Sequence, residues 1–247
     1  MSWGVPDMLT FDGVGRRFAG GAGVEELTFG VAPGEVVALI GLNGAGKTTL
    51  MRLALGILRA DRGTVRLFGR PLGDLPQASW ADVGALIEVP SAYPELTVRE
   101  NLHIACLLHG VEPARVDETL AAWRIAPLAD RRFRRLSLGN RQRTCLAAAF
   151  HHDPRLIVLD EPSNALDPRS VILLREHIAR HAAQGAAILV SSHHLDEVAR
   201  VADRVLLMNG GRLIGELDTA GADLERVFFE RLRADDEQRH GAQEGAR

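Results

Sequence analysis

The sequence predicts an α/β fold with a parallel sheet, an antiparallel β-subdomain at the N-terminus and a helical subdomain inserted in the middle. Three observations predict this fold class. Short apolar runs alternate with glycines over the first thirty-odd residues, residues 90–150 carry helix signals without strands, and strands alternate with helices after that. Such alternation is typical of a parallel sheet covered by helices on both faces.

The N-terminal apolar runs predict a small antiparallel sheet. They are Met8 to Phe11, Val24 to Val31 and Thr64 to Phe68. A turn at Pro33-Gly34 then leads into Val36 to Ile40, which contains only apolar residues. An all-apolar run of this length indicates a parallel strand that is buried on both faces.

A glycine-rich loop, Gly41 to Thr48, follows this strand and precedes a helix expected over Thr48 to Leu58. It matches Gly-x-x-x-x-Gly-Lys-[Ser/Thr], a phosphate-binding P-loop, in the strand-loop-helix setting that the motif requires. Amides of the loop and the helix N-terminus bind phosphate, while the threonine hydroxyl binds Mg²⁺. The alternative, a simple glycine-rich turn, does not explain the flanking strand and helix. The predicted phosphate site comprises Gly41, Asn43, Gly44, Ala45, Gly46, Lys47, Thr48 and Thr49.

Lys47 is the only lysine among the 29 lysines and arginines of the chain. A compact ammonium fits between phosphate oxygens where a planar guanidinium does not. We therefore expect Lys47 to contact the terminal phosphates of a nucleoside triphosphate.

The middle of the chain predicts a helical subdomain over about residues 90–150. A strand over Val83 to Glu88 leads into a proline-bearing loop. Thr97 and Glu100 then form a capping-box pattern that begins a helix ending near His109, and Pro113 begins a second helix that ends near Trp123.

A pair of carboxylates follows the buried strand Leu156 to Leu159. Asp160 and Glu161 thus lie at the carboxyl end of a strand, where ligands bind in parallel sheets. We expect Asp160 to hold Mg²⁺ and Glu161 to orient and deprotonate the attacking water. A strand-ending turn is the alternative interpretation of Asp-Glu-Pro, and it is weakened by the P-loop upstream.

The remaining elements complete the alternation and set the expected boundaries. We expect an ATPase domain over residues 1–217, a C-terminal helix within 218–233 and a disordered tail over 234–247. The elements expected after the carboxylates are helix Pro168 to Ala183, strand Ala187 to Val190, helix Leu195 to Ala202, strand Val205 to Met208, strand Arg212 to Leu217 and helix Ala222 to Arg233.

Composition excludes several classes of function. The net charge of -3 gives no overall basic field for nucleic acid, so the run Arg131 to Arg135 is interpreted as a solvated face and no nucleic-acid partner is expected. Cys106 and Cys145 lack ligand spacing, which favours reduced core thiols over a disulfide or zinc site. No apolar run approaches the roughly 20 residues of a membrane helix, and no signal peptide is expected, so a membrane role requires a separate partner.

The segment Leu136-Ser137-Leu138-Gly139-Asn140, which lies ahead of the Asp-Glu strand, resembles the signature of the ABC transporter ATP-binding family. The resemblance covers roughly Met8 to Leu217. It implies that Ser137 and Gly139 cap the γ-phosphate of ATP bound by a second copy of the domain. Leu138 and Asn140 depart from the commonest signature, Leu-Ser-Gly-Gly-Gln.

Other positions match the family in order. The resemblance implies that Phe18 stacks on adenine, that Ser163 to Asp167 couples the two ATP sites, and that His193 contacts the γ-phosphate. Each has an alternative: Phe18 in the core, Asp167 as a helix N-cap and His193 as a strand-end histidine. Glu88 stands where most members have glutamine, and its carboxylate can still contact the metal. The predicted metal set is therefore Thr48, Glu88 and Asp160.

The chain most resembles the subfamily that exports bacitracin and lantibiotics or confers immunity to them, and the resemblance lies in Gly84 to Ser91, Tyr93-Pro94, Leu96-Thr97 and Ser137-Leu138-Gly139. It implies an ATP- and Mg²⁺-dependent ATPase subunit that powers export of a peptide antibiotic or other drug-like substrate. The expected partners are a transmembrane permease and a second ATPase subunit, in a homodimer or heterodimer on the cytoplasmic face of the cell membrane. Two alternatives remain open: a soluble ABC-type ATPase acting on nucleic acid or ribosomes, and a small-molecule kinase or GTPase.

Overall fold

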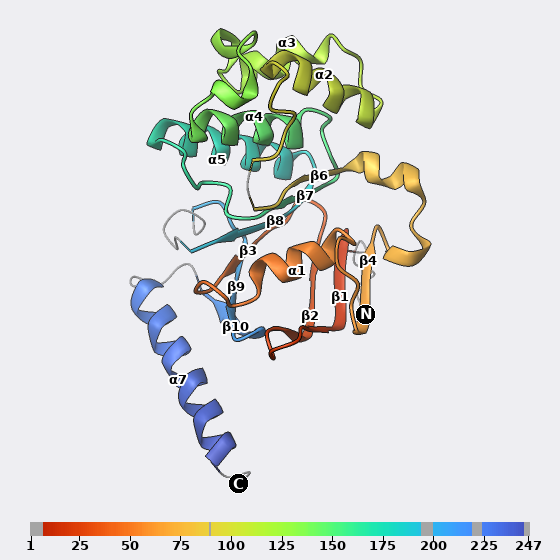
Figure 1. Cartoon of the computed structure of the whole chain (residues 1–247). Coiled ribbons are helices and arrows are strands. Elements are labelled where there is room, and N and C mark those ends of the chain that lie inside the picture. Colours follow the sequence, from red (N-terminus) through yellow and green to blue (C-terminus); the bar gives the residue numbers. More distant parts are fainter. Residues whose placement is uncertain (1–6, 89, 194–199, 219–223, 245–247) are drawn as a thin grey trace.

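The computed structural model describes residues 7–88, 90–193, 200–218 and 224–244, and it contains two sheets (Figure 1). The smaller sheet is antiparallel and has the strand order β2-β1-β4-β5. This confirms the predicted N-terminal β-subdomain. Its strands are β1 (Leu9–Arg17), β2 (Gly23–Val31), β4 (Arg62–Leu67) and β5 (Arg70–Pro71).

The larger sheet has the strand order β10-β9-β3-β8-β7-β6, and every pair is parallel except β9 with β10. Three of its strands, β3, β7 and β8, are completely buried, and β6 is buried except at Ala85. The strands are β3 (Val36–Ile40), β6 (Val83–Leu86), β7 (Leu156–Leu159), β8 (Ala187–Ser192), β9 (Arg204–Asn209) and β10 (Arg212–Leu217).

Strand β3 contributes to two hydrophobic cores because successive side chains point to opposite faces of a sheet. Val37 and Leu39 belong to a core that α1 (Lys47–Ala54) and the antiparallel sheet complete. Ala38 and Ile40 belong to a second core, on the side of the helical subdomain. The loop after β3 is thus fixed from both faces of the sheet.

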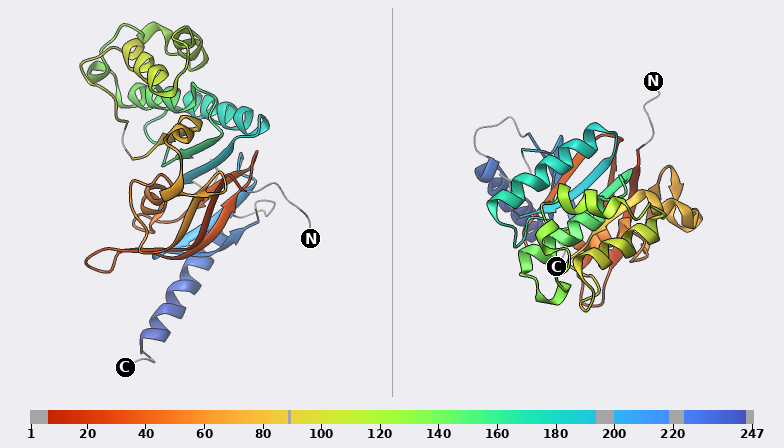
Figure 2. Two further views of the ribbon diagram at one scale, coloured as in Figure 1. Left: turned by 90° about the vertical axis from the view of Figure 1, so that its right-hand side faces the viewer. Right: turned by 90° about the horizontal axis from the view of Figure 1, so that it is seen from above.

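The helices between β6 and β8 gather at one end of the molecule, above the parallel sheet (Figures 1 and 2). In α2 the predicted capping box is present, since Thr97 Oγ1 accepts from the Glu100 amide and the Glu100 carboxylate accepts from the Thr97 amide. The helices are α2 (Val98–His109), α3 (Arg115–Ala122), α4 (Leu138–Phe150) and α5 (Pro168–Ala183), with 3-10 turns at Leu72–Asp74, Gln77–Asp82, Ala126–Leu128 and Phe133–Arg135.

Two predicted elements end earlier in the structure. Helix α1 ends at Ala54 rather than at Leu58, because Gly56 takes a left-handed conformation with φ 65°. Strand β6 ends at Leu86, and Glu88 has φ 63°, which is incompatible with an extended strand. The helix predicted over Leu195 to Ala202 lies largely outside the described residues.

The C-terminal helix α7 (Leu224–Glu244) extends beyond its predicted end at Arg233. Residues 234–244, which were expected to be disordered, are helical. Asp235 explains the difference: its carboxylate accepts hydrogen bonds from Asn209 and Arg212 at the β9–β10 turn. Phe228 and Leu232 on the preceding turns are buried. In Figure 1 the far half of α7 projects away from the sheets. Among the described helices, none combines the length and hydropathy needed to cross a membrane.

Two expectations from composition also agree with the structure. Cys106 and Cys145 are free and buried. In the arginine run, Phe133 is buried, while Arg132 and Arg134 lie near the carboxylate of Glu95, at 3.6 and 3.2 Å. The run is therefore a partly neutralised surface segment.

Candidate functional site

The P-loop connects β3 to α1, and its glycines are required by the path of the backbone. A Cβ on Gly41 would lie 2.3 Å from the carbonyl oxygen of Met208. Gly44 and Gly46 have φ 83° and 103°, a region that strongly favours glycine. Gly46 is also the residue before the first turn of α1. The loop thus presents backbone amides at a helix N-terminus, as an anion site requires.

Lys47 lies at the first position of α1, and its side chain folds back over the loop. Its Nζ donates to the carbonyl oxygen of Gly41 at 2.7 Å and lies 3.4 Å from Oε1 of Glu161. The residue is only 6% exposed. A buried ammonium held by two loop carbonyls, of Gly41 and Leu42, and by one carboxylate is positioned for a polyphosphate.

Asp160, directly after β7, accepts hydrogen bonds on both carboxylate oxygens. Thr48 Oγ1 donates to Oδ2 at 2.6 Å, and Ser191 Oγ donates to Oδ1 at 2.5 Å. The strands bring these groups together, because β7 and β3 are both hydrogen-bonded to β8. The structure therefore joins Thr48 and Asp160, which are 112 residues apart in the sequence.

Glu161 lies between two nitrogen groups. Its Oε1 faces Lys47, and its Oε2 accepts from Nδ1 of His193 at 2.6 Å. Its backbone is left-handed, with φ 48°, and its amide donates to Ser191 Oγ at 2.9 Å. A non-glycine residue in this conformation is found mostly where the surroundings hold it in place.

Ser191 is a site residue that the sequence analysis did not single out. It is completely buried, and its hydroxyl donates to Asp160 while accepting from the Glu161 amide. The signal that could have found it is the change from apolar residues to Ser191-Ser192 at the carboxyl end of β8.

The predicted signature forms the start of α4. Ser137 is its N-cap, and the hydroxyl oxygen accepts from the Asn140 amide at 3.4 Å. A Cβ on Gly139 would lie 2.5 Å from the carbonyl oxygen of Ala165, so the helix packs directly on the loop 163–167. Gln142 reinforces this contact by donating to the carbonyl of Pro162 at 2.9 Å.

In the described part of the chain, no hydrogen bond or ion pair joins Ser137 or Gly139 to the P-loop. Asp167, at the end of the loop 163–167, is the N-cap of α5: its carboxylate accepts from the Ser170 amide at 2.7 Å, which lowers the pKa of Asp167.

Glu88 forms an ion pair with Arg52 of α1. Both side chains are substantially exposed, with 46% and 36% of their surface accessible. Arg52 was not predicted as a site residue, since arginine on an exposed helix face carries no signal in the sequence. The structure thus places the carboxylate of Glu88 against α1 and leaves its contact with metal as a prediction.

Phe18 lies in the turn between β1 and β2, and Arg16 fixes one face of its ring. The Arg16 guanidinium carbon is 5.3 Å from the ring centroid, and Arg16 Nη1 donates to Asp61 at 2.6 Å. The half-buried ring therefore has one face occupied, which leaves a single face for a stacked base.

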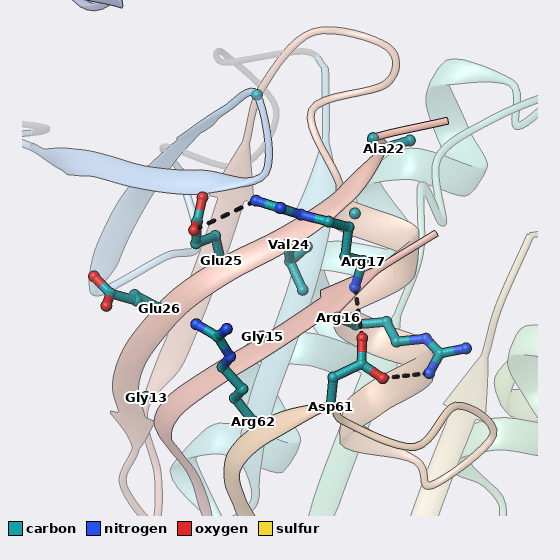
Figure 3. A pocket seen from close by; sticks show the side chains of 13 residues that line it. Gly13, Gly15, Arg16, Arg17, Ala22, Val24, Glu25, Glu26, Asp61 and Arg62 are labelled. Atoms are coloured by element: carbon teal, nitrogen blue, oxygen red, sulfur yellow. Dashed lines mark hydrogen bonds and ion pairs between the residues drawn. The ribbon is translucent and has the colours of Figure 1, made fainter. Parts of the chain in front are cut away.

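A cavity of about 330 Å³ lies beside this turn, on the antiparallel sheet (Figure 3). Arg17 and Glu25 face each other across it at 3.7 Å, and Arg16 pairs with Asp61 at its edge. None of the predicted site residues lines this cavity. The predicted site residues instead contact one another around Lys47 and Asp160, outside this cavity.

Comparison with known proteins agrees with this geometry. A family model described as ABC transporter matches residues 24–164. The chain is 37% identical over 212 residues to the Nod factor export ATP-binding protein I of Paraburkholderia xenovorans, covering 84% of this chain and 70% of that protein. It is 36% identical over 197 residues to the bacitracin transport ATP-binding protein of Enterococcus faecalis, covering 79% and 64% respectively.

Among solved structures, one described as the ATP binding subunit of an ABC transporter superposes with a TM-score of 0.83 at 29% identity. The superposition covers 91% of this chain and 99% of the other. Both sheets and the inserted helices are thus shared with a protein of that description.

Proposed function

We propose that this chain, which belongs to the ABC transporter family and is an ATPase, powers transport through a separate transmembrane permease. One observation carries the catalytic part of the proposal. Lys47, Thr48, Asp160 and Glu161 meet at the carboxyl edge of the parallel sheet, joined by contacts of 2.6 and 3.4 Å. A cation, a hydroxyl and two carboxylates in this arrangement suit hydrolysis of a nucleoside triphosphate.

Each of these groups has a distinct proposed role. Lys47 and the P-loop amides bind the phosphates of ATP and hold them in one orientation. Glu161 accepts the proton of the attacking water, and its hydrogen bond with His193 fixes where the carboxylate points. Phe18 provides the ring on which adenine stacks.

The residues present fit Mg²⁺. Thr48 and Asp160 bring a hydroxyl and a carboxylate oxygen to 2.6 Å of each other, and hard oxygen ligands are those that this ion prefers. Ser191 orients the carboxylate from its other oxygen. Glu88 is proposed as a further ligand, acting once it leaves Arg52. When bound, the ion neutralises charge on the phosphate oxygens.

Two copies of the chain are proposed to complete each site. Ser137 is exposed at the N-terminus of α4 and makes no polar contact with its own P-loop among the described residues. An exposed hydroxyl and the glycine backbone at a helix N-terminus are suited to a phosphate supplied from outside the chain. We propose that Ser137 and Gly139 contact the γ-phosphate of ATP bound to a second ATPase subunit.

The permease is proposed to dock on a groove of about 440 Å³ between β6 and the helices α2 and α4. Its lining is mostly apolar and includes Tyr93 and Leu108, whose exposed fractions are 59% and 75%. Exposed apolar residues around a groove are typical of an interaction surface. Docking there would hold the chain at the cytoplasmic face of the cell membrane.

The names of the two relatives describe export and transport. They support an exporter subunit, and the bacitracin protein supports a peptide antibiotic or other drug-like substrate. The alternative, a soluble ATPase acting on nucleic acid or ribosomes, gains no support from these relatives.

The experiment is co-expression with a polytopic membrane protein, sought among the products of the neighbouring genes, followed by purification from detergent-solubilised membranes. We expect the two proteins to co-purify and ATP hydrolysis to respond to the membrane partner. Leu108→Glu is expected to abolish co-purification while ATP binding stays unchanged. Leu107→Glu is the matched control, since Leu107 is the exposed neighbour on α2 that does not line the groove.

Failure to co-purify, together with ATPase activity stimulated by nucleic acid without membranes, would favour the soluble alternative. Preference for GTP over ATP would instead favour the small-molecule kinase or GTPase hypothesis. Equal co-purification of the Leu108 and Leu107 variants would place the permease on a different surface.

A further inference from the structure

Three histidines gather where α2 and α4 end, away from the P-loop. His109 is the last residue of α2, and His151 and His152 directly follow α4. One ring nitrogen of each lies within 4.8 Å of the others. The rings of His109 and His152 are stacked with centroids 3.8 Å apart, and the His151 ring lies 5.2 and 4.8 Å from them.

Hydrogen bonds select the tautomer of two of these rings. Nδ1 of His109 lies 2.9 Å from the carbonyl oxygen of Ala105, and Nδ1 of His151 lies 2.7 Å from that of Ala148. A carbonyl oxygen only accepts, so each Nδ1 carries the proton and each Nε2 keeps its lone pair. Imidazole ligands of metals commonly have this arrangement, in which Nδ1–H is bound to a carbonyl and Nε2 faces the ion.

Nδ1 of His152 lies 3.4 Å from Nδ1 of His151, whereas the Nε2 atoms of both rings have no partner among the described residues. His151 is 4% exposed. A buried polar atom without a partner costs about 1–3 kcal/mol. Two such atoms lie together in this cluster, and each keeps its full capacity for a further contact.

One cationic side chain lies beside the cluster. Arg115, which donates to the His151 carbonyl at 3.0 Å, is paired with Asp153 and Glu118, so its charge is compensated.

We propose that His109, His151 and His152 form a binding site for a first-row transition-metal ion, with Zn²⁺ the expected ion. Three imidazoles and one water make a common Zn²⁺ ligand set, with Zn–N distances of about 2.0–2.1 Å. At those distances the ligand nitrogens lie about 3.3 Å apart in a tetrahedral site, so the cluster has to contract.

To bring the three nitrogens closer, the side chain of His109 has to move more than those of His151 and His152. Its ring is stacked on His152, and two stacked rings cannot direct their lone pairs at one ion, so the His109 ring has to turn about its side-chain bonds. His109 is half-buried and precedes Gly110, the left-handed residue that ends α2. Because His109 is the last residue of α2, its ring can turn without moving the core, although the contact of Nδ1 with Ala105 is then replaced.

The site joins two segments of the helical subdomain. It links the end of α2 to the connection between α4 and β7, and two of its ligands, His109 and His152, line the proposed permease groove. Bound metal thus fixes α2 relative to the parallel sheet at one end of that groove. The proposal itself rests on the histidine geometry and is independent of the permease assignment.

The test measures Zn²⁺ affinity of the full chain, prepared without a histidine tag, by competition with a chromophoric chelator. We expect His109→Gln and His152→Gln to weaken binding of one ion by more than about tenfold, since even the loss of an outer partner of a zinc ligand costs 10–100-fold. His103→Gln is the matched control, because His103 is exposed on the same helix. The pair Glu161 and His193 offers Zn²⁺ a second place to bind in the same titration. Binding there is identified as the part that His193→Gln removes, and it is subtracted.

Thermal unfolding gives a second readout that does not depend on the catalytic site. Zn²⁺ is expected to raise the Tm of the wild type and of His103→Gln but not of His109→Gln, because only a ligand that binds the native state stabilises it. Without metal the variants are expected to melt as single cooperative transitions, which shows that they fold. Wild-type affinity in both His109→Gln and His152→Gln would overturn the proposal, as would a wild type that binds no ion beyond the one dependent on His193.

Discussion

The carboxylate of Glu161 accepts a hydrogen bond from Nδ1 of His193 at 2.6 Å, while its other oxygen lies 3.4 Å from the ammonium of Lys47. The proposed base is thus oriented from two sides by the protein itself. This arrangement distinguishes Glu161 from Asp160, whose oxygens are both taken by hydroxyl donors. It makes the two neighbouring carboxylates separable by mutation.

Glu161→Gln is expected to keep ATP binding and to lower hydrolysis by about 10²–10⁴-fold, the usual contribution of a general base. The amide cannot accept the proton of water, but it preserves the shape of the side chain. Because ATP is then not consumed, we also expect a stable ATP-bound dimer in size-exclusion chromatography with light scattering. Glu176→Gln, on the exposed face of α5, is the control. Turnover like that of the wild type would exclude Glu161 as the base.

Lys47→Ala is expected to weaken ATP binding by at least about tenfold, since a hydrogen bond to a charged group contributes about 1.5–3 kcal/mol. Lys47→Arg is expected to weaken it as well, because the lysine is only 6% exposed and its Nζ packs on the carbonyl of Gly41. Titration of a fluorescent ATP analogue measures both. Unchanged affinity in the alanine variant would contradict the phosphate site, and unchanged affinity in the arginine variant would contradict only the steric argument.

Ser137→Asp tests the proposed contact across the dimer. Aspartate is as good an N-cap as serine, so α4 is expected to remain stable, but its carboxylate would repel a γ-phosphate. We expect ATP binding to the isolated chain to stay unchanged while ATP-dependent dimerisation and hydrolysis are lost. Ser137→Thr, which keeps both the hydroxyl and the cap, is expected to retain both. Full hydrolysis by the aspartate variant would show that Ser137 does not face phosphate.

Glu88 and Arg52 allow a test in which the two variants act in opposite directions. Glu88→Ala is expected to raise the Mg²⁺ concentration for half-maximal ATPase activity, because a proposed oxygen ligand is lost. Arg52→Ala is expected to lower it by about two- to fivefold, the equivalent of the 0.5–1 kcal/mol of an exposed ion pair. Shifts in the same direction would mean that Glu88 acts in some way other than as a metal ligand released by Arg52.

Much of this fold could be predicted because its signals are local. The strand Val36–Ile40, the strand Leu156–Leu159 and the helix Pro168–Ala183 have the bounds expected from sequence. Each combines a clear apolar pattern with a capping or turn residue, such as Asp167 before α5. The P-loop was equally visible, because its glycines and its lysine stand at fixed spacing.

What the sequence could not predict depends on contacts between distant residues. Arg52 became relevant only when Glu88 was placed against α1, and Ser191 only when β8 lay beside β7. The predicted end of α7 at Arg233 was too early, because Asp235 is held by Asn209 and Arg212 and no local pattern indicates this contact. The cluster of His109 with His151 and His152 has the same origin, since 42 residues separate His109 from His151 and only the packing of α2 on α4 joins them.

His177 predicts how stability depends on pH. Its ring is buried and stacked on Trp123 with centroids 4.1 Å apart, and Arg180 donates to its Nδ1 at 2.8 Å. Burial, with Arg180 nearby, lowers the pKa of His177 from 6.5 to about 4. Between these values the unfolded chain binds a proton that the native chain does not. The stability that His177 contributes is therefore fully present above about pH 6.5 and is lost as the pH falls towards 4.

His177→Gln is expected to flatten this dependence, because glutamine does not titrate. Between pH 7 and pH 5 the free energy of unfolding of the wild type is expected to fall by on the order of 1–2 kcal/mol more than that of the variant. Urea unfolding at a series of pH values measures the slope, which separates titration from the packing lost at Trp123, since lost packing lowers stability equally at every pH. His103→Gln, exposed on α2, is expected to keep the slope of the wild type. Parallel curves for His177→Gln and the wild type would show that His177 protonates equally in the native and unfolded chains.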